Sequence, residues 1–199
     1  MNKIFLILLT IVSINCLSFR SGEHENAEIV NKLDAPPKAI IKINLKYDYR
    51  VDGAKQGDIN PQLVDAWLKT AEETLKESSE VTVSREDILA NYFFEMTVRE
   101  ETNSFSTTVS PFISGLTLGL IPSYTKSDIT VNTIVKDKKG NVLGEVTKKE
   151  SLKMVGQILI VFVNVFVKPL DTIIAQRKDL LRASYLEIKQ NNIFKGSKK

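Results

Sequence analysis

The only cysteine of the sequence, Cys16, is the residue whose position says most about its chemistry. Lys3 precedes an apolar run over residues 4–12, and small or polar residues connect this run to Cys16. This order is typical of a secretory signal peptide, and the run is too short to cross a hydrocarbon core of about 30 Å as a helix. A single thiol cannot close an intrachain disulfide or build a cysteine zinc cage. The alternative is an uncleaved anchor in which Cys16 is a buried structural residue.

Catalytic chemistry has little support elsewhere in the chain. The single histidine, His24, lies in a polar stretch, and neither a phosphate-binding glycine motif nor a G-x-S-x-G elbow occurs. A glycosidase-type site needs two carboxylates held across a cleft, and we expect the adjacent acids to be solvated instead. These acids are Glu72–Glu73, Glu86–Asp87 and Glu100–Glu101. The sequence thus predicts a protein that is not an enzyme and that has no cofactor, metal or small-molecule ligand; a carboxylate-dependent envelope hydrolase is the catalytic alternative.

Charge is distributed unevenly along the chain. The formal net charge is +3 over 199 residues, and residues 148–199 hold 11 basic and 4 acidic side chains. Such a basic portion can contact anionic lipid headgroups, or it can form a solvated helix surface and a lysine-rich tail. The basic residues are not interleaved with aromatic ones, so no nucleic-acid partner is predicted.

Composition divides the chain into four parts. We expect residues 1–15 to form the signal peptide and residues 16–37 to form a polar tether that precedes the domain. Residues 38–192 form a single domain, long enough for one hydrophobic core, and residues 193–199 form a basic tail.

Within the domain, apolar and polar residues alternate over residues 41–51, which is the pattern of a strand with one buried face. Pro61 predicts the start of an amphipathic helix over residues 61–78, with Trp67 as a core residue in its apolar stripe. A helix is also predicted from Pro169. The remaining predicted strands cover residues 80–84, 90–98, 129–135 and 142–149, the last two joined by a turn at 138–141. The fold class is therefore α+β: a mainly antiparallel sheet of four to five strands packed against an amphipathic helix, with C-terminal helices.

Two apolar segments, residues 111–124 and 154–167, have no polar face. Each is shorter than the roughly 20 residues of a spanning helix, and prolines limit the first, which weakens the G-x-x-x-G spacing of Gly115 and Gly119 as a membrane motif. We expect both segments to pack mainly against the sheet; the alternative is an exposed patch that contacts lipid or a partner. The side chains that would make this contact are Phe112, Leu116, Leu118, Ile121, Ile160, Phe162 and Phe166.

Two features resemble bacterial lipoproteins. The place of Cys16 resembles a lipobox, in which the thiol receives a diacylglyceryl group and becomes the mature N-terminus, although Ser13 and Asn15 differ from the usual Leu and Gly or Ala. Leu17 stands where an Asp would imply inner-membrane retention, so the resemblance favours the outer membrane.

Residues 105–190 also resemble a group of bacterial lipoproteins without an assigned activity. That group shares an L-T-x-G-x-(I/L)-P run, a hairpin centred on a D-x-x-G turn, an apolar segment and a closing helix. An aromatic residue is frequent early in the apolar segment of the group, whereas Lys153 and Met154 stand there in this chain. The matching positions are Leu116, Thr117, Gly119, Ile121, Pro122, Asp137 and Gly140.

Together these features predict a non-catalytic, membrane-anchored envelope lipoprotein that acts as an interaction or structural module. Its partners would be the membrane, through the lipid anchor at Cys16, and an envelope protein. It would reside in the bacterial cell envelope, lipid-anchored, at the outer membrane. The alternative is an accessory subunit of an envelope transport or assembly complex that docks through the two apolar segments.

Overall fold

The computed structural model describes residues 16–29, 39–57, 60–156 and 169–195, with the side chains of Cys16, Pro169 and Lys195 excepted. Its strands are β1 (Cys16–Arg20), β2 (Ala39–Val51), β3 (Ala54–Lys55), β4 (Val81–Val83), β5 (Tyr92–Thr102), β6 (Ser123–Asp137) and β7 (Val142–Gly156). Its helices are α2 (Pro61–Lys76), the π-helix η1 (Phe105–Val109), α3 (Ser110–Leu116), α4 (Pro169–Gln190) and the 3-10 helix η3 (Ile193–Lys195).

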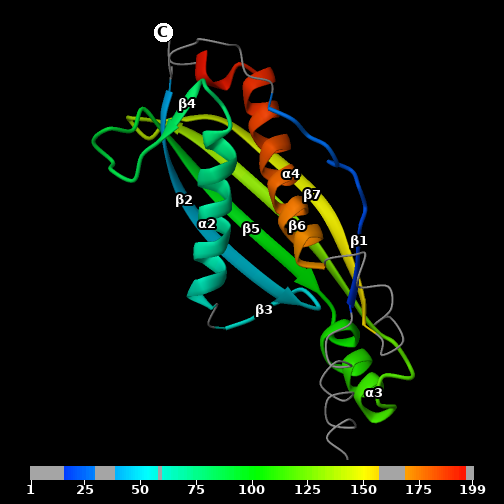
Figure 1. The fold of residues 1–199 in the computed structure, drawn as a ribbon. Helices are drawn as coiled ribbons and strands as arrows, with labels where there is room; N and C mark the ends of the chain where they lie inside the picture. Colours follow the sequence, from blue (N-terminus) through cyan, green and yellow to red (C-terminus); the bar gives the residue numbers. More distant parts are fainter. Residues whose placement is uncertain (1–15, 30–38, 58–59, 157–168, 196–199) are drawn as a thin grey trace, which may run out of the picture.

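The seven strands form one mixed sheet, which confirms the α+β class. The order is β1-β7-β6-β5-β2-β3, and β4 pairs with β2 (Figure 1). The pairs β1–β7, β7–β6, β6–β5 and β2–β3 are antiparallel, whereas β2 runs parallel to both β5 and β4. The sheet has more strands than the four to five predicted, because the segment at Cys16 and the short strand β3 beside β2 add to it.

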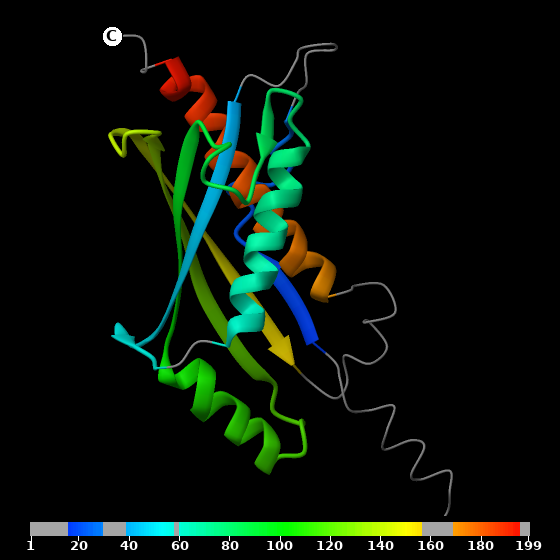
Figure 2. The same ribbon diagram turned by 90° about the vertical axis from the view of Figure 1, so that its left-hand side faces the viewer.

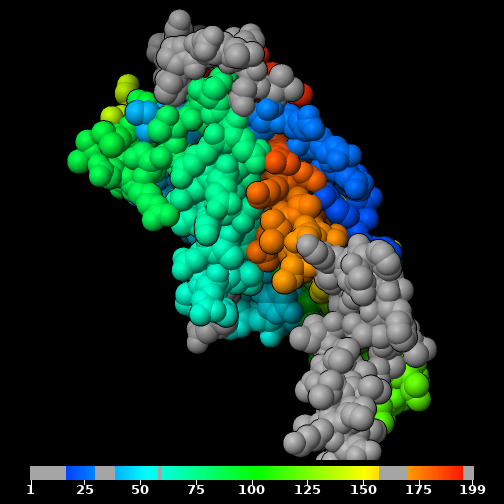
Figure 3. Space-filling model, viewed as in Figure 1, coloured from blue at the N-terminus to red at the C-terminus, as the bar shows by residue number. Residues whose placement is uncertain are grey.

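Helices α2 and α4 lie side by side on one face of the sheet (Figures 1 and 3). Alternate residues of the central strands are buried beneath them, as in β2 and β6, so period-2 patterning fixes which strand face meets the helices. The other face of the sheet carries the polar residues of the same strands. The core cluster includes Ile41, Phe94, Val98, Val131, Leu180 and Tyr185.

Helix α2 starts where the sequence predicts and ends two residues earlier, at Lys76. The Asn60 side chain accepts a hydrogen bond from the Gln62 backbone N–H at 2.9 Å, and Pro61 takes the first helical position. Trp67 is 0% exposed, and the Arg177 guanidinium lies 4.8 Å from its ring centroid. Trp67 is therefore the core anchor of the helix, held against α4 as well as the sheet.

Both ends of the predicted domain differ from the expectation. Residues 16–20, predicted as part of a polar tether, form β1 on the edge of β7. At the other end, Ile193 is 8% exposed, and the Phe194 ring lies 5.1 Å from Tyr92 and 6.1 Å from Phe94, centroid to centroid. The segment predicted as a basic tail thus begins with core residues; composition misses them because only two apolar side chains stand among lysines.

The predicted apolar segment 154–167 is described only at its start, where residues 154–156 continue β7. Ile160, Phe162 and Phe166, the predicted contact residues of this segment, lie outside the described residues.

The buried position of Trp67 generates a stability prediction. We expect Trp67→Ala to lower the free energy of unfolding by about 3–5 kcal/mol, because a large buried ring is replaced by a cavity. Urea denaturation followed by circular dichroism measures this change. Leu170→Ala, at a side chain that is 71% exposed, should stay within about 0.5 kcal/mol of the wild type; an equal, small effect of both substitutions would contradict the assignment.

Candidate functional site

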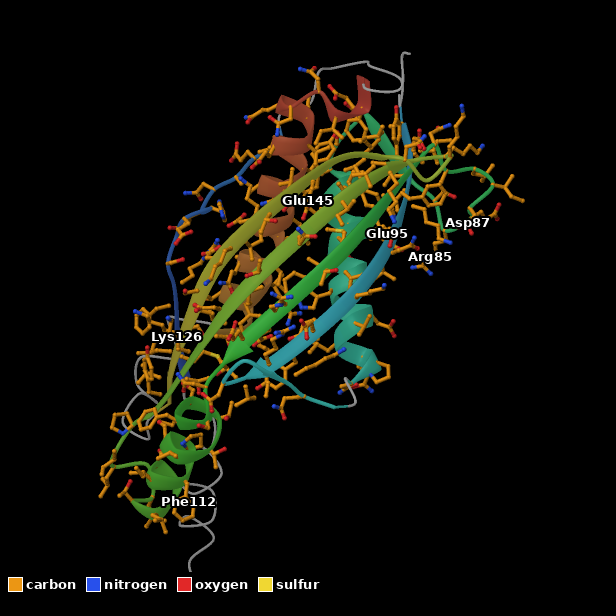
Figure 4. All side chains as sticks on the ribbon, turned by 180° about the vertical axis from the view of Figure 1, so that it is seen from behind. Arg85, Asp87, Glu95, Phe112, Lys126 and Glu145 are labelled. Carbon is orange, nitrogen blue, oxygen red and sulfur yellow. The ribbon has the colours of Figure 1, made fainter. Side chains whose placement is uncertain are left out.

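The most unusual surface of the molecule is a helical arm at one end of the sheet, formed by η1, α3 and the turn after them. We call residues 103–122 the apolar projection. No charged residue and no histidine occurs over residues 102–125. Figure 4 places Phe112 far from the sheet on this arm, and it is 65% exposed.

Exposed apolar side chains concentrate on this projection. Among the described residues, eight of the fourteen large hydrophobic side chains that are exposed belong to it. Leu116 is 70% exposed, Leu118 80% and Leu120 69%. A cluster of this kind on a monomer marks a contact with lipid, protein or ligand. The eight residues are Phe105, Val109, Phe112, Ile113, Leu116, Leu118, Leu120 and Ile121.

The buried residues of the projection are small and polar, and they attach it to β6. Ser110 Oγ accepts the Tyr124 backbone N–H at 2.6 Å, and Ser106 Oγ accepts that of Lys126 at 3.2 Å. Both serines are at most 4% exposed. Spaced four residues apart, they lie on the same side of the helical arm, so the apolar side chains are directed away from the sheet.

The tip of the projection contains a leucine in a backbone conformation that favours glycine. Leu118 has φ 51°, and the two bonds of a Schellman cap are present: Gly119 N–H to Ser114 C=O at 2.7 Å and Leu118 N–H to Gly115 C=O at 3.1 Å. A left-handed conformation costs a non-glycine residue about 1–2 kcal/mol. This strained residue is also the most exposed hydrophobic residue of the projection, so folding alone does not account for a leucine here.

Cys16 lies at the same end of the sheet as the projection. Its backbone pairs with Gly156 at the end of β7, and Gly156 pairs with Ser123, the residue directly after the projection. Three neighbouring strands thus bring the first residue of β1 to within two strand spacings of the projection, about 10 Å across the sheet.

A buried ion-pair cluster fixes β1 in this position. Arg20 donates to both oxygens of Glu150, at 2.7 and 3.0 Å, and to Asp179 on α4 at 2.7 Å. The side chains of Arg20, Glu150 and Asp179 are 10%, 0% and 8% exposed. Arg182 extends the cluster, donating to Asp179 at 3.2 Å and to Glu77 at 2.7 and 2.8 Å. We call this cluster the Arg20 clasp.

The acidic partners in the clasp favour the charged form of Arg20. Burial, the largest single effect, lowers the pKa of Arg20, but the hydrogen bonds to Glu150 and Asp179 and the negative charges of these residues together raise it by more, so the net pKa lies above its ordinary value. The Gly22 backbone N–H also donates to Glu150, at 3.2 Å. Both oxygens of the buried carboxylate are therefore satisfied, which is the condition for a buried pair to be stable.

The structure brings together four of the seven predicted contact residues. Phe112, Leu116, Leu118 and Ile121 share the projection, and the expectation that residues 111–124 pack mainly against the sheet is wrong, because the serines and not the apolar side chains face β6. The sequence analysis missed Phe105, Val109, Ile113 and Leu120. The uncharged stretch over residues 102–125 is the signal that contains all of them.

Among the described residues, the buried or partly buried carboxylates that could act in catalysis are held by neighbouring side chains. Glu72 is held by Arg85 at 3.0 Å through both oxygens, and Glu100 accepts from Tyr47 and from Ser127 at 2.8 Å. No group of three or more metal-ligating side chains occurs in the described part of the chain. No described helix has the length and apolar character needed to cross a membrane.

Comparison with known proteins does not assign this chain to a family. No protein-family model and no curated protein sequence matches the chain. A PelC dodecamer from Paraburkholderia phytofirmans is similar with TM-score 0.36 and 10% identity, covering 85% of this chain and 94% of that chain. A neuraminyllactose-binding hemagglutinin homolog from Helicobacter pylori is similar with TM-score 0.35 and 9% identity, covering 78% and 96%. At these values the likeness assigns neither family nor function.

The Arg20 clasp predicts a large effect of a single substitution. We expect Arg20→Met to lower the free energy of unfolding by about 3–5 kcal/mol, because Glu150 would remain buried without its counter-charge. Lys149→Met is the control: Lys149 is 61% exposed and 3.8 Å from Asp128, and its loss should cost less than about 1 kcal/mol. If chemical denaturation found both variants within 1 kcal/mol of wild type, β1 would not depend on the clasp.

The strained tip predicts that removing a side chain does not destabilise the fold. We expect Leu118→Gly to leave the free energy of unfolding unchanged or to raise it by up to about 1 kcal/mol, since glycine adopts the left-handed conformation without steric cost. Leu116→Gly removes an equally exposed leucine from helical backbone and should cost about 0.5–1 kcal/mol. Thermal unfolding of the two variants compares them; a larger loss for Leu118→Gly would mean that its side chain supports the fold.

Proposed function

We propose that this protein is a non-catalytic lipoprotein of the bacterial cell envelope, attached to a bilayer by an acylated Cys16 and by the apolar projection beside it. The observation that carries the proposal is the exposure of eight large apolar side chains, in a stretch without charge, at the end of the sheet where β1 begins. The signal-peptide pattern before Cys16 supports the lipid, and Leu17 after it supports the outer membrane.

The energetics favours two attachments acting together. Burying a leucine or phenylalanine side chain completely is worth about 1.5–3 kcal/mol, so several half-exposed side chains entering lipid would contribute several kcal/mol. A diacylglyceryl group carries two acyl chains, which together make a stable anchor, and contact through the projection would add to it. The lipid would also hold the projection at a high effective concentration near the bilayer, so modest apolar contact is enough.

Because β1 would follow the lipid without a long spacer, the proposed attachment would orient the sheet relative to the membrane. If Cys16 is the mature N-terminus, the acyl group sits on the first residue of β1, which the Arg20 clasp holds to β7 and α4. The sheet would then stand with its projection end at the membrane. The β6–β7 turn, at the opposite end of both strands, would face away from the membrane and toward partners.

The second candidate function is the accessory subunit of an envelope complex, in which the projection would bind an apolar groove of a partner instead of lipid. The projection is narrow and helical, which suits helix-in-groove recognition. The lack of charge throughout the projection favours lipid, because protein interfaces usually carry a polar rim.

Two measurements test the proposed attachment. In cells, a palmitate analogue should label the wild-type chain and not Cys16→Ser. In vitro, the Cys16→Ser chain made without residues 1–15 should float with phosphatidylcholine vesicles, whose neutral headgroups exclude a purely ionic contact. Leu118→Gly together with Leu116→Ser should reduce the floating fraction at least fivefold, because both side chains lie at the outer end of the projection.

The control for flotation is Ile88→Ser, which removes a side chain that is 83% exposed but lies in the loop between β4 and β5. It should float like the parent chain. Equal labelling of wild type and Cys16→Ser would refute the lipid anchor. Labelling without flotation would keep the anchor and assign the projection to a protein partner.

A further inference from the structure

Strand β2 has an edge that is only partly covered. On one side it pairs with β5 over residues 41–51. On the other side β4 pairs with residues 39–41 and β3 with residues 50 and 51, so no described strand pairs with residues 42–49 on that side. Figure 2 views the molecule from the side on which this part of β2 lies.

The hydrogen bonds at the two ends of β2 show which backbone groups face this edge. The Ala39 N–H donates to Glu80 C=O, the Ser84 N–H to Ile41 C=O, and the Gln56 N–H to Tyr49 C=O. In a parallel pair each residue directs both its N–H and C=O to one neighbour, and the direction alternates along the strand. The β2–β5 register has no irregularity, so the intervening odd residues, Ile43, Leu45 and Tyr47, also face the free edge.

These three residues present six backbone groups over about 13 Å of strand, taking 3.3 Å per residue. No described residue hydrogen-bonds them on that edge. Unpaired edges of this length are templates for another strand, and proteins usually shorten or cover them. Here β4 and β3 cover only the ends.

A groove of about 620 Å³ lies between β2 and α2, at the part of this edge nearest to β4. Ser84 and Arg85, which follow β4, also line it. Since β4 ends at Val83 and the chain then turns away, the groove occupies the space that a continued β4 would fill. Ile43 and Leu68 give it apolar surface. A strand lying here would direct every second side chain toward these residues and the others toward the open face of the sheet.

On the open face, the charge beside the edge is positive. Lys42 and Lys46 flank Asn44 on β2; Lys42 pairs with Asp87, and Asn44 donates to Glu95 at 3.0 Å. Lys46 is exposed and has no ion pair among the described residues. An acidic side chain on an added strand would therefore find a cross-strand partner in Lys46, a pair worth about 0.2–1 kcal/mol.

We propose that the free edge of β2 accepts an extended segment of a partner protein as an added strand, and that this segment alternates small apolar side chains with acidic ones. Backbone hydrogen bonds to Ile43, Leu45 and Tyr47 give affinity. Leu68 contacts the apolar side chains of the segment, and Lys46 pairs with an acidic one. This inference goes beyond the proposed membrane attachment and does not depend on it, because the edge belongs to the sheet and not to the projection.

The test uses two fluorescent seven-residue peptides, TVEVEVT and its charge-reversed control TVKVKVT, with the Cys16→Ser chain lacking residues 1–15 and no lipid present. Fluorescence anisotropy should give at least tenfold tighter binding of the acidic peptide. Lys46→Glu should abolish or reverse this preference. Lys149→Glu, an exposed lysine on β7 across the same face of the sheet, should leave it unchanged.

Amide hydrogen exchange then locates the bound peptide. The backbone N–H groups of Ile43, Leu45 and Tyr47 should exchange at least tenfold more slowly with the acidic peptide present. Absence of binding, binding that is insensitive to Lys46→Glu, or binding without this protection would overturn the proposal. Protection that rises with protein concentration alone, together with dimers in sedimentation, would overturn it in favour of a second copy as the occupant.

Discussion

The position of β1 depends on the Arg20 clasp, and much of the molecule's arrangement depends on β1. Arg20, on the edge strand, neutralises two carboxylates that come from β7 and α4. Through Asp179 and Arg182 the same cluster reaches Glu77 at the end of α2. The clasp therefore joins the sheet edge to both helices that cover the sheet. Leaving Glu150 buried without Arg20 would cost about 3–5 kcal/mol, so the clasp strongly favours the position of this segment along β7.

This constraint converts a short N-terminal segment into part of the rigid body. A polar tether would let a lipid-anchored domain tumble, whereas a strand that begins at Cys16 would hold one end of the sheet at the membrane if Cys16 carries the proposed lipid. The projection lies at that same end, and its serines attach it to β6 through two backbone hydrogen bonds. In the proposed attachment, the orientation of the sheet and the contact through the projection would both follow from the registers of β1, β7 and β6.

The described residues leave two surfaces of the fold without cover. The projection exposes leucines, one in a strained backbone conformation, and β2 exposes backbone groups between two short strands. The end of the core beside η3 is closely packed: Gly144 leaves no room for a Cβ because Ile193 Cδ1 would lie 2.6 Å from it, and Phe194 contacts Tyr92, Phe94 and Tyr185. The proposed membrane contact and the proposed strand addition rest on these two surfaces.

The sequence by itself determined the elements with strong local signals. Alternation in β2, the Asn60–Pro61 helix start and the apolar stripe with Trp67 are local patterns, and they led to the correct strand, helix and core residue. Only the tertiary structure decided where the uncharged segment lies and what β1 does. An apolar run is compatible with a core or with an exposed arm, and Ser106 and Ser110 decide between them through bonds to residues 14 to 20 positions away. Arg20 meets Glu150 and Asp179 across 130 and 159 residues, a pairing that no local pattern contains, because ion pairs of this kind depend on which strands become neighbours.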